Sequence, residues 1–134
     1  MENCIFCKII AGDIPSMRVY EDEDCIATLD ISPASAGHTL VIPKTHHTDL
    51  TDGTDAALLG KLMMVAKTIG MRQKERLGAE GFNIVQNNGA AAGQTVPHLH
   101  IHVIPRYEAG PQMVVWKQTD PTTEQLREIH ERLS

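Results

Sequence analysis

The chain has 134 residues, of which 42% are hydrophobic and 22% charged, and a formal net charge of −5. This length predicts one domain with its own core. The acidic balance and the absence of a Lys/Arg run argue against DNA or RNA binding, and no apolar run approaches the roughly 20 residues of a membrane span. The N-terminus lacks a signal-peptide pattern, and three cysteines are too few for a disulfide scaffold, so we expect a cytoplasmic protein.

Short apolar stretches bounded by turn residues predict β-strands. The first segment, residues 4–10, is mixed apolar and ends at a turn over residues 12–15. Pro43 is expected to end a fully buried strand, because proline cannot donate to a sheet ladder. The predicted strands are residues 18–21, 25–29, 39–42 and 82–86, followed by the histidine-rich stretch at 98–104.

Apolar residues recur at helical spacing over residues 55–77, which predicts one long helix. Asp52 or Thr54 is expected to cap its start, and Gly78 suits its end. A second, short helix is expected over residues 121–133, with Asp120 as its cap.

The links between most predicted strands are too short for parallel crossovers, which need a dozen or more residues. We therefore predict an α+β fold with an antiparallel sheet of about five strands and the helices on one side. Residues 1–134 would form a single domain, with its core over about 4–116.

Three histidines alternate with apolar residues in His98-Leu99-His100-Ile101-His102. On a strand, all three imidazoles would line one face, while the intervening apolar residues would enter the core on the other. Imidazole can be a nucleophile, an acid/base group or a metal ligand near neutral pH. A half-buried strand that merely carries histidines outward is the alternative.

A loop of small residues, 87–95, runs directly into the histidine row. It places flexible backbone N–H groups and the side chains of Gln94 and Thr95 beside the imidazoles. That arrangement suits a phosphate whose charge is held while a ring nitrogen attacks phosphorus. Gly89 and Gly93 can also be read as simple turn residues.

The stretch from Gly93 to Arg106 resembles the signature of the histidine triad (HIT) family of nucleotide hydrolases and transferases. The resemblance extends upstream to Asn87 and to residues 30–33 and 37–44, and it covers the chain to about Trp116. It implies a HIT-like fold, a homodimer and a purine nucleotide substrate. The implied reaction cleaves the α-phosphate bond of a nucleoside phosphoramidate or dinucleoside polyphosphate through a nucleotidyl-histidine intermediate, releasing a nucleoside monophosphate.

The resemblance also implies roles for individual residues. His100 would be the nucleophile, His102 and His38 would lie around it and the phosphate, and Asp30 would hold the ribose hydroxyls. Thr95 would assist catalysis and, with Asn87, Gly93 and Gln94, contact the phosphate and leaving group. The base pocket would comprise Phe6, Ile9, Ile14 and Ile31, for which plain core packing is the alternative.

Three further positions bear on the resemblance. Many relatives place a phenylalanine against the base two residues before the ribose aspartate, where this chain has Thr28. The base preference therefore stays open. Trp116 lies in the stretch that, in relatives, approaches the partner's active site, and ordinary packing is its alternative. His38 has an alternative too, as a hydrogen-bonded histidine at the start of a strand.

Cys4-Ile5-Phe6-Cys7 could supply two ligands to a tetrahedral Zn²⁺, but two ligands do not make a site. Some HIT proteins hold a structural zinc at positions that match Cys4, Cys7, His46 and His98 here. The resemblance thus implies a structural zinc, which would leave His100 and His102 for chemistry. Two reduced thiols are the alternative.

Two other functions remain open from the sequence. One is a hydrolase with a catalytic zinc on the three histidines, for which the spacing is poor, since the outer two would be about 13 Å apart along a strand. The other is a nucleotide-binding regulatory or partner-binding module with little catalysis. Residues 103–106 are similar to dinucleoside polyphosphate hydrolases and residues 30–33 to phosphoramidases, so the branch is undecided.

Overall fold

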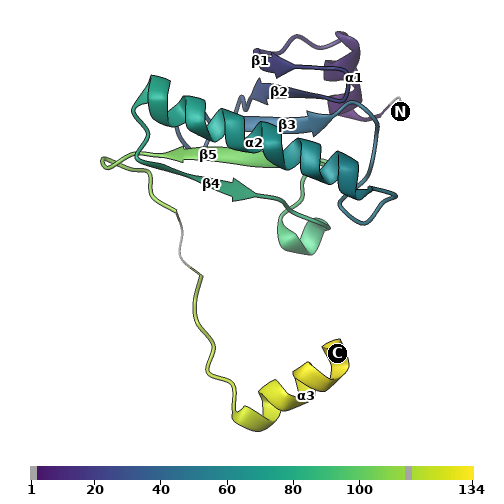
Figure 1. The fold of residues 1–134 in the computed structure, drawn as a ribbon, viewed down its shortest axis with the longest axis vertical. Coiled ribbons are helices and arrows are strands. Elements are labelled where there is room, and N and C mark those ends of the chain that lie inside the picture. Colours follow the sequence, from purple (N-terminus) through teal and green to yellow (C-terminus); the bar gives the residue numbers. More distant parts are fainter. Residues whose placement is uncertain (1–2, 114–115) are drawn as a thin grey trace.

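The computed structural model describes residues 3–113 and 116–134, and it has a five-stranded antiparallel sheet (Figure 1). The spatial order of the strands is β1-β2-β3-β5-β4. This confirms the predicted α+β class. The strands are β1 (Arg18–Glu21), β2 (Cys25–Leu29), β3 (Thr39–Pro43), β4 (Gly81–Val85) and β5 (Ile101–Arg106); the helices are α1 (Ile5–Ala11), α2 (Ala56–Leu77) and α3 (Thr123–Leu133), with a 3₁₀ turn, η1, at Ala90–Ala92.

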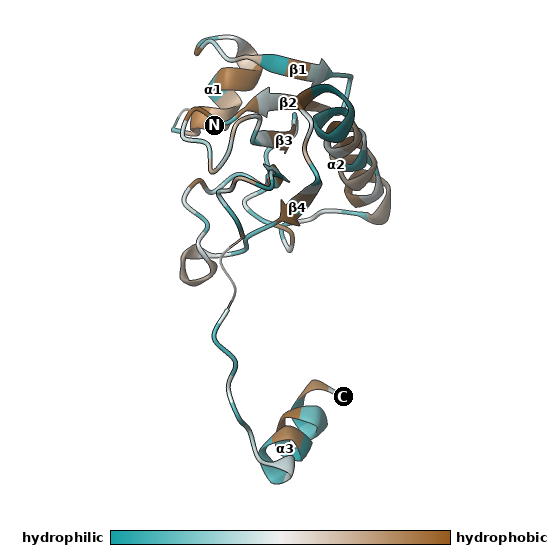
Figure 2. Ribbon diagram, turned by 90° about the vertical axis from the view of Figure 1, so that its left-hand side faces the viewer, coloured by the Kyte–Doolittle hydropathy of each residue, from teal (hydrophilic) through white to brown (hydrophobic). Residues whose placement is uncertain are grey.

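Both faces of the sheet are apolar, and each is covered by a different helix (Figure 2). Side chains alternate between the faces of a strand, so Val41 packs on the α2 side while Leu40 and Ile42 pack with Phe6 of α1. The prediction that the helices share one side is therefore wrong. An uncovered second face would leave Ile26 and Ile42, both fully buried, in contact with water.

Helix α2 is capped by Asp55 at its start and by Gly78 at its end. Its cap is Asp55, whose carboxylate accepts a hydrogen bond from the amide of Leu58 at 2.8 Å. Asp52 and Thr54 were the wrong candidates, because both side chains bond within the preceding loop, Asp52 to the amide of Thr48. Gly78 ends the helix as predicted, with a left-handed φ of 73° that favours glycine.

The C-terminal helix α3 stands apart from the sheet at the end of an extended segment (Figure 1). Its cap is Thr122, which forms a capping box with Gln125, so the prediction of Asp120 is wrong. A capping box satisfies two backbone donors at once, which a single aspartate does not. No residue of α3 is buried.

The histidine row is only partly a strand. Strand β5 begins at Ile101, so His102 alone of the three histidines lies in it, and the prediction of a strand for His98 and His100 is wrong. The amide of Leu99 donates instead to the carbonyl of His47 at 2.6 Å, outside the sheet. The alternation itself is confirmed, because Leu99 and Ile101 are buried in the core under α2.

Within the described residues, no helix combines the length and the apolar character that crossing a membrane requires.

Gly70 in α2 faces the ring of Phe82 of β4 so closely that a Cβ there would lie 2.5 Å from ring atoms. Gly70→Ala is expected to lower the free energy of unfolding by about 1–3 kcal/mol, because overpacking outweighs the helix preference of alanine. Gly60→Ala, in the same helix with nothing within 4 Å of the new Cβ, should raise it by up to about 1 kcal/mol. Urea unfolding followed by circular dichroism measures both, and stabilisation by both substitutions would contradict the packing of Phe82.

Candidate active site and metal centre

The candidate site lies on the α1 side of the sheet, where β3 and β5 meet. His102 in β5 pairs with Leu40 of β3 and with Val85 of β4, so it occupies the middle of the sheet. Asp30 directly follows β2, and His38 directly precedes β3. Because β2 and β3 are adjacent and antiparallel, the end of one and the start of the other meet at the same edge of the site.

The loop that carries His38 is anchored at three points by other elements. Ser35 Oγ donates to the carbonyl of Pro105 at 2.5 Å, and Tyr107 Oη donates to the carbonyl of Ala36 at 2.6 Å. Gln73 of α2 donates from Nε2 to the carbonyl of Gly37 at 3.0 Å. The sequence reading missed these anchors, because each joins a side chain to a backbone carbonyl that is distant in the chain.

The imidazole of His100 is oriented by one backbone carbonyl. Its Nδ1 lies 2.7 Å from the carbonyl oxygen of His98, and since a carbonyl can only accept, Nδ1 carries the proton. The lone pair of a neutral ring is then on Nε2. Phe6 packs edge-on against the same ring, with centroids 5.0 Å apart. His100 is thus buried, fixed in orientation and equipped with a defined basic nitrogen.

His38 and His102 form a second oriented pair. The amide of Ala34 donates to His38 Nδ1 at 2.9 Å, so in the neutral ring the proton lies on Nε2. That N–H faces His102 Nδ1 at 3.0 Å. His102 must therefore carry its own proton on Nε2. The ring centroids of His100 and His102 lie 4.9 Å apart. His100 has a lone pair on Nε2, whereas His102 has an N–H donor there.

These hydrogen-bond assignments require neutral rings, and burial provides that condition. Burial lowers the pKa of His38 and His100, and it is the largest cause for both. Burial, with the neighbouring His100 and His38, lowers the pKa of His102 to about 4. All three rings are consequently neutral around pH 7.

Both carboxylate oxygens of Asp30 have contacts within the site. One carboxylate oxygen, Oδ1, accepts from the amide of Ser32 at 2.8 Å, and the other, Oδ2, lies 3.5 Å from His38 Nε2. Ligand atoms of Asp30, His38 and His102 lie within 4.8 Å of one another, as in a metal site. A metal is nonetheless disfavoured there, because His38 Nδ1 accepts the Ala34 amide and its Nε2 therefore carries a proton.

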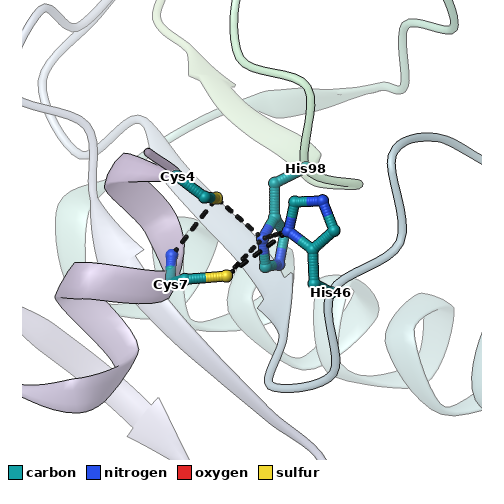
Figure 3. A group of neighbouring side chains, drawn as sticks. All are labelled: Cys4, Cys7, His46 and His98. Atoms are coloured by element: carbon teal, nitrogen blue, oxygen red, sulfur yellow. Dashed lines mark hydrogen bonds between the residues drawn. The ribbon is translucent and has the colours of Figure 1, made fainter. Parts of the chain in front are cut away.

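A second cluster joins Cys4, the N-cap of α1, and Cys7 of the same helix to two distant histidines (Figure 3). His98 Nδ1 lies 3.2 Å from Cys4 Sγ, 3.5 Å from Cys7 Sγ and 3.0 Å from His46 Nδ1. His46 Nδ1 lies 3.3 Å from Cys7 Sγ. The four ligand atoms all lie within 4.8 Å of one another, which confirms that the residues singled out from the sequence converge.

The chemistry of this cluster suits a tetrahedral metal. Zn–S and Zn–N bonds place neighbouring ligand atoms about 3.3–3.8 Å apart, close to the observed separations. His98 Nε2 donates to the carbonyl of Pro43 at 2.9 Å, which leaves Nδ1 with its lone pair toward the sulfurs. Burial lowers the pKa of His98 to about 4, so the ring is neutral, as a ligand must be.

The loop residues predicted to hold phosphate differ in what their side chains contact. The side chain of Gln94 braces the loop: Oε1 accepts from the amide of Gly89 at 2.8 Å, and Nε2 donates to the carbonyls of Thr48 and Val96 at 2.7 and 3.0 Å. Thr95 is exposed. Gly93 and Asn87 lie together, since a Cβ on Gly93 would be 3.8 Å from Asn87 Nδ2.

The predicted base-pocket residues also differ in environment. Phe6 is buried beside His98 and His100, and Ile9 packs against the same cluster. Ile14 is half-buried, whereas Ile31 is 96% exposed and plain core packing is wrong for it. Thr28 is 2% exposed, and its hydroxyl has no hydrogen-bond partner among the described residues.

Trp116 is 73% exposed, so packing into its own domain does not account for it. The three triad histidines do not converge on one point either. In the described part of the chain, His98 belongs to the cysteine cluster and His102 to the Asp30 cluster, and neither includes His100. A single catalytic metal held by all three is therefore contrary to this geometry.

Comparison with known proteins places these features in a family. The HIT domain model matches residues 11–109. A crystal structure of a HIT family protein from Bacillus subtilis is 45% identical, with a TM-score of 0.88 over 98% of this chain and 94% of that one. A Zn-bound histidine triad family protein from Mycobacterium smegmatis is 41% identical, with a TM-score of 0.78 over 98% of this chain and 96% of that one.

A relative with a named activity also matches nearly end to end. Adenosine 5'-monophosphoramidase hnt1 of Schizosaccharomyces pombe is 38% identical over 98% of this chain and 96% of its own length. The matched regions contain the oriented histidines and the loop that precedes them. With a family model that spans most of its length and relatives that cover nearly all of it, this chain belongs to the HIT family.

Proposed function

We propose that this protein is a histidine triad hydrolase that cleaves the α-phosphate bond of purine nucleoside phosphoramidates or dinucleoside polyphosphates. The observation that carries the proposal is the hydrogen bond from His100 Nδ1 to the carbonyl of His98, which directs a neutral lone pair to Nε2. The phosphoramidase activity in the name of the fission-yeast relative supports the phosphoramidate class of substrate.

In the first step, the His100 Nε2 lone pair forms a bond to the α-phosphorus. The bond to the leaving group breaks, and its electron pair departs with that group, which takes a proton from solvent. The ring becomes positively charged, and the carbonyl of His98 then accepts a stronger, charge-assisted hydrogen bond from Nδ1. In the second step, water attacks phosphorus, the N–P pair returns to Nε2, and the nucleoside monophosphate leaves as the water's proton passes to solvent.

The other site residues stabilise charge in this proposal. The amide of Ala34 fixes the tautomer of His38, and the N–H of His38 in turn fixes the proton of His102 on Nε2. The Nε2–H of His102 then donates to a phosphate oxygen. Asn87, Gly93 and Thr95 lie on the loop that faces the phosphate, and Gln94 keeps that loop in shape. Asp30 orients His38, and its remaining lone pairs accept ribose hydroxyls.

We also propose that Cys4, Cys7, His46 and His98 bind a structural zinc ion. Bound zinc would supply a fixed cross-link between α1 and the histidine segment, without activating water. His98 contributes its ring to the ligand set and its carbonyl to His100, so this cross-link positions the nucleophile. The zinc-bound relative from Mycobacterium smegmatis supports the assignment. We further propose a cytoplasmic homodimer, as the family resemblance implies.

His100→Asn is expected to reduce kcat for adenosine 5'-phosphoramidate and diadenosine polyphosphates by at least about 10³-fold, because no lone pair then attacks phosphorus. Intact mass spectrometry of quenched turnover mixtures should show an AMP adduct on the unsubstituted protein and none on the variant. His130→Asn in α3 is the matched control and should keep both activity and adduct.

Hydrolysis that survives His100→Asn would exclude this nucleophile. An unsubstituted protein that binds AMP in calorimetry but cleaves neither substrate would instead establish a nucleotide-binding module. AMP binding by His100→Asn in the same calorimetry would show that the variant is folded.

Elemental analysis should find one zinc ion for each chain. Cys7→Ser or His46→Ala should lose it and lower the free energy of unfolding by at least about 2 kcal/mol, because zinc binds only the folded cluster. Cys25→Ala should keep the zinc, since Cys25 is buried in the other core, under α2. Activity that disappears in proportion to chelated zinc while circular dichroism stays unchanged would point to catalytic metal instead. A protein purified without zinc that also fails to bind added zinc would refute the site.

A further inference from the structure

Among the buried residues that the structure describes in α2, Gln73 alone has a polar side chain. It is 3% exposed and lies on the face of the sheet opposite to the candidate site. The buried apolar side chains of the same helix, such as Val65 and Ile69, pack with Val41 and Val103 to form the core on that face. A buried amide in such surroundings lowers stability unless its hydrogen bonds are made.

The side-chain nitrogen of Gln73 uses its hydrogens on two backbone carbonyls. Nε2 donates to the carbonyl of Gly37 and to that of Val103, at 3.0 Å each. An amide NH₂ group offers two N–H donors from one uncharged atom, so it can bridge two carbonyls without burying a charge. The oxygen Oε1, by contrast, has no partner among the described residues. Because an unpaired buried acceptor lowers stability, the two donated bonds are the better explanation for this side chain.

Both carbonyls adjoin a histidine of the candidate site. Gly37 directly precedes His38, and Val103 directly follows His102. The pairing of β3 with β5 starts at the residue after His38, which lies opposite Val103, so His38 lies one residue outside this ladder. The bridge from Gln73 spans the two segments at the point where their backbone pairing stops.

The peptide group between Gly37 and His38 is held at both of its polar atoms. Its carbonyl accepts from Gln73 and also from Thr39 Oγ1 at 2.8 Å, and its N–H donates to the carbonyl of Ser35 at 3.1 Å. Glycine is required for the approach of this loop to α2, because a Cβ on Gly37 would collide with the side chain of a leucine in the last turn of the helix. The loop and α2 are therefore closely fitted.

We propose that Gln73 is a positioning residue for the hydrolysis proposed above, on which this inference rests. Its amide fixes the separation of the segments that carry His38 and His102, and thereby maintains the hydrogen bond of 3.0 Å between His38 Nε2 and His102 Nδ1. That bond keeps the proton of His102 on Nε2, where it faces the phosphate. Gln73 contacts neither substrate nor reacting atoms and acts through His102, from the other side of the sheet.

Gln73→Met removes both donors and keeps an unbranched side chain of similar length. We expect kcat for adenosine 5'-phosphoramidate to fall at least about 10-fold, because a misplaced donor stabilises the charge of the transition state less well. KM should stay within 3-fold, since that charge develops after binding. Val65→Ala is the matched control: it opens the core under the same helix without touching either carbonyl, and kcat should stay within 2-fold.

A double-mutant cycle tests the route through His102. In a His102→Ala background, adding Gln73→Met should lower kcat by less than 2-fold further, because the donor that Gln73 positions is already gone. The full 10-fold loss in both backgrounds would overturn this route. Equal losses from Gln73→Met and Val65→Ala would show that Gln73 only supports packing, and would overturn the proposal too.

Nuclear magnetic resonance of protein labelled with ¹⁵N-histidine provides a readout that needs no turnover. In Gln73→Met, the ring nitrogen shifts of His102 should move toward a mixture of tautomers. Those of His100 should stay unchanged, because its Nδ1–H donates to the carbonyl of His98, which Gln73 does not touch. Unchanged His102 shifts in a folded variant would refute the positioning role.

The two proposals fail in distinguishable ways. An unsubstituted protein that cleaves no substrate would refute the hydrolysis, while the ring nitrogen shifts of His102 would still test Gln73. If Gln73→Met does not fold, Thr39→Val removes the other side-chain donor to the Gly37 carbonyl and keeps Gln73. Its effect on the His102 shifts should then have the same direction and a smaller size, and the absence of any effect would overturn the proposal.

Discussion

The hydrogen bond between His100 Nδ1 and the carbonyl of His98 is the contact on which the site depends. It assigns the proton of a buried ring to one nitrogen and leaves the other basic. Neither atom is free to move independently, because the His98 ring is itself held between the carbonyl of Pro43 and the cysteine cluster. One residue thus joins the proposed metal centre to the proposed nucleophile, through its side chain on one side and its carbonyl on the other.

The three histidines of the row are chemically unequal because different groups accept or donate at their Nδ1 atoms. His98 Nδ1 keeps a lone pair among the sulfurs, His100 Nδ1 donates to a carbonyl, and His102 Nδ1 accepts from His38. Burial keeps all three rings neutral, which is the state in which these roles are distinct. The three roles proposed for them, metal ligand, nucleophile and hydrogen-bond donor, rest on these differences within one repeated residue type.

The sheet provides rigidity by using both of its faces. Helix α2 covers one face, and α1 covers the other, next to the site. Hydrogen bonds to β5, from α2 and from Tyr107 hold the loop before His38, and this loop in turn positions the His38–His102 pair. Gln94 has an analogous role in the loop before His98, because its side chain bonds to the backbone of Gly89, Thr48 and Val96.

The amino-acid sequence by itself determined the local elements and the chemical inventory. Short apolar stretches bounded by turn residues identified β2 and β3, the 3.6-residue period identified α2, and Gly78 marked its end, because these signals arise within a few residues. The two cysteines and two histidines of the cluster were found through a family resemblance. What only the tertiary structure decided involves partners distant in the chain: the face on which α1 packs, the carbonyls that choose each histidine's tautomer, and the separation of α3 from its own core. Backbone carbonyls and amides are common to every residue, so no side-chain pattern can show which of them will meet an imidazole until the chain has folded.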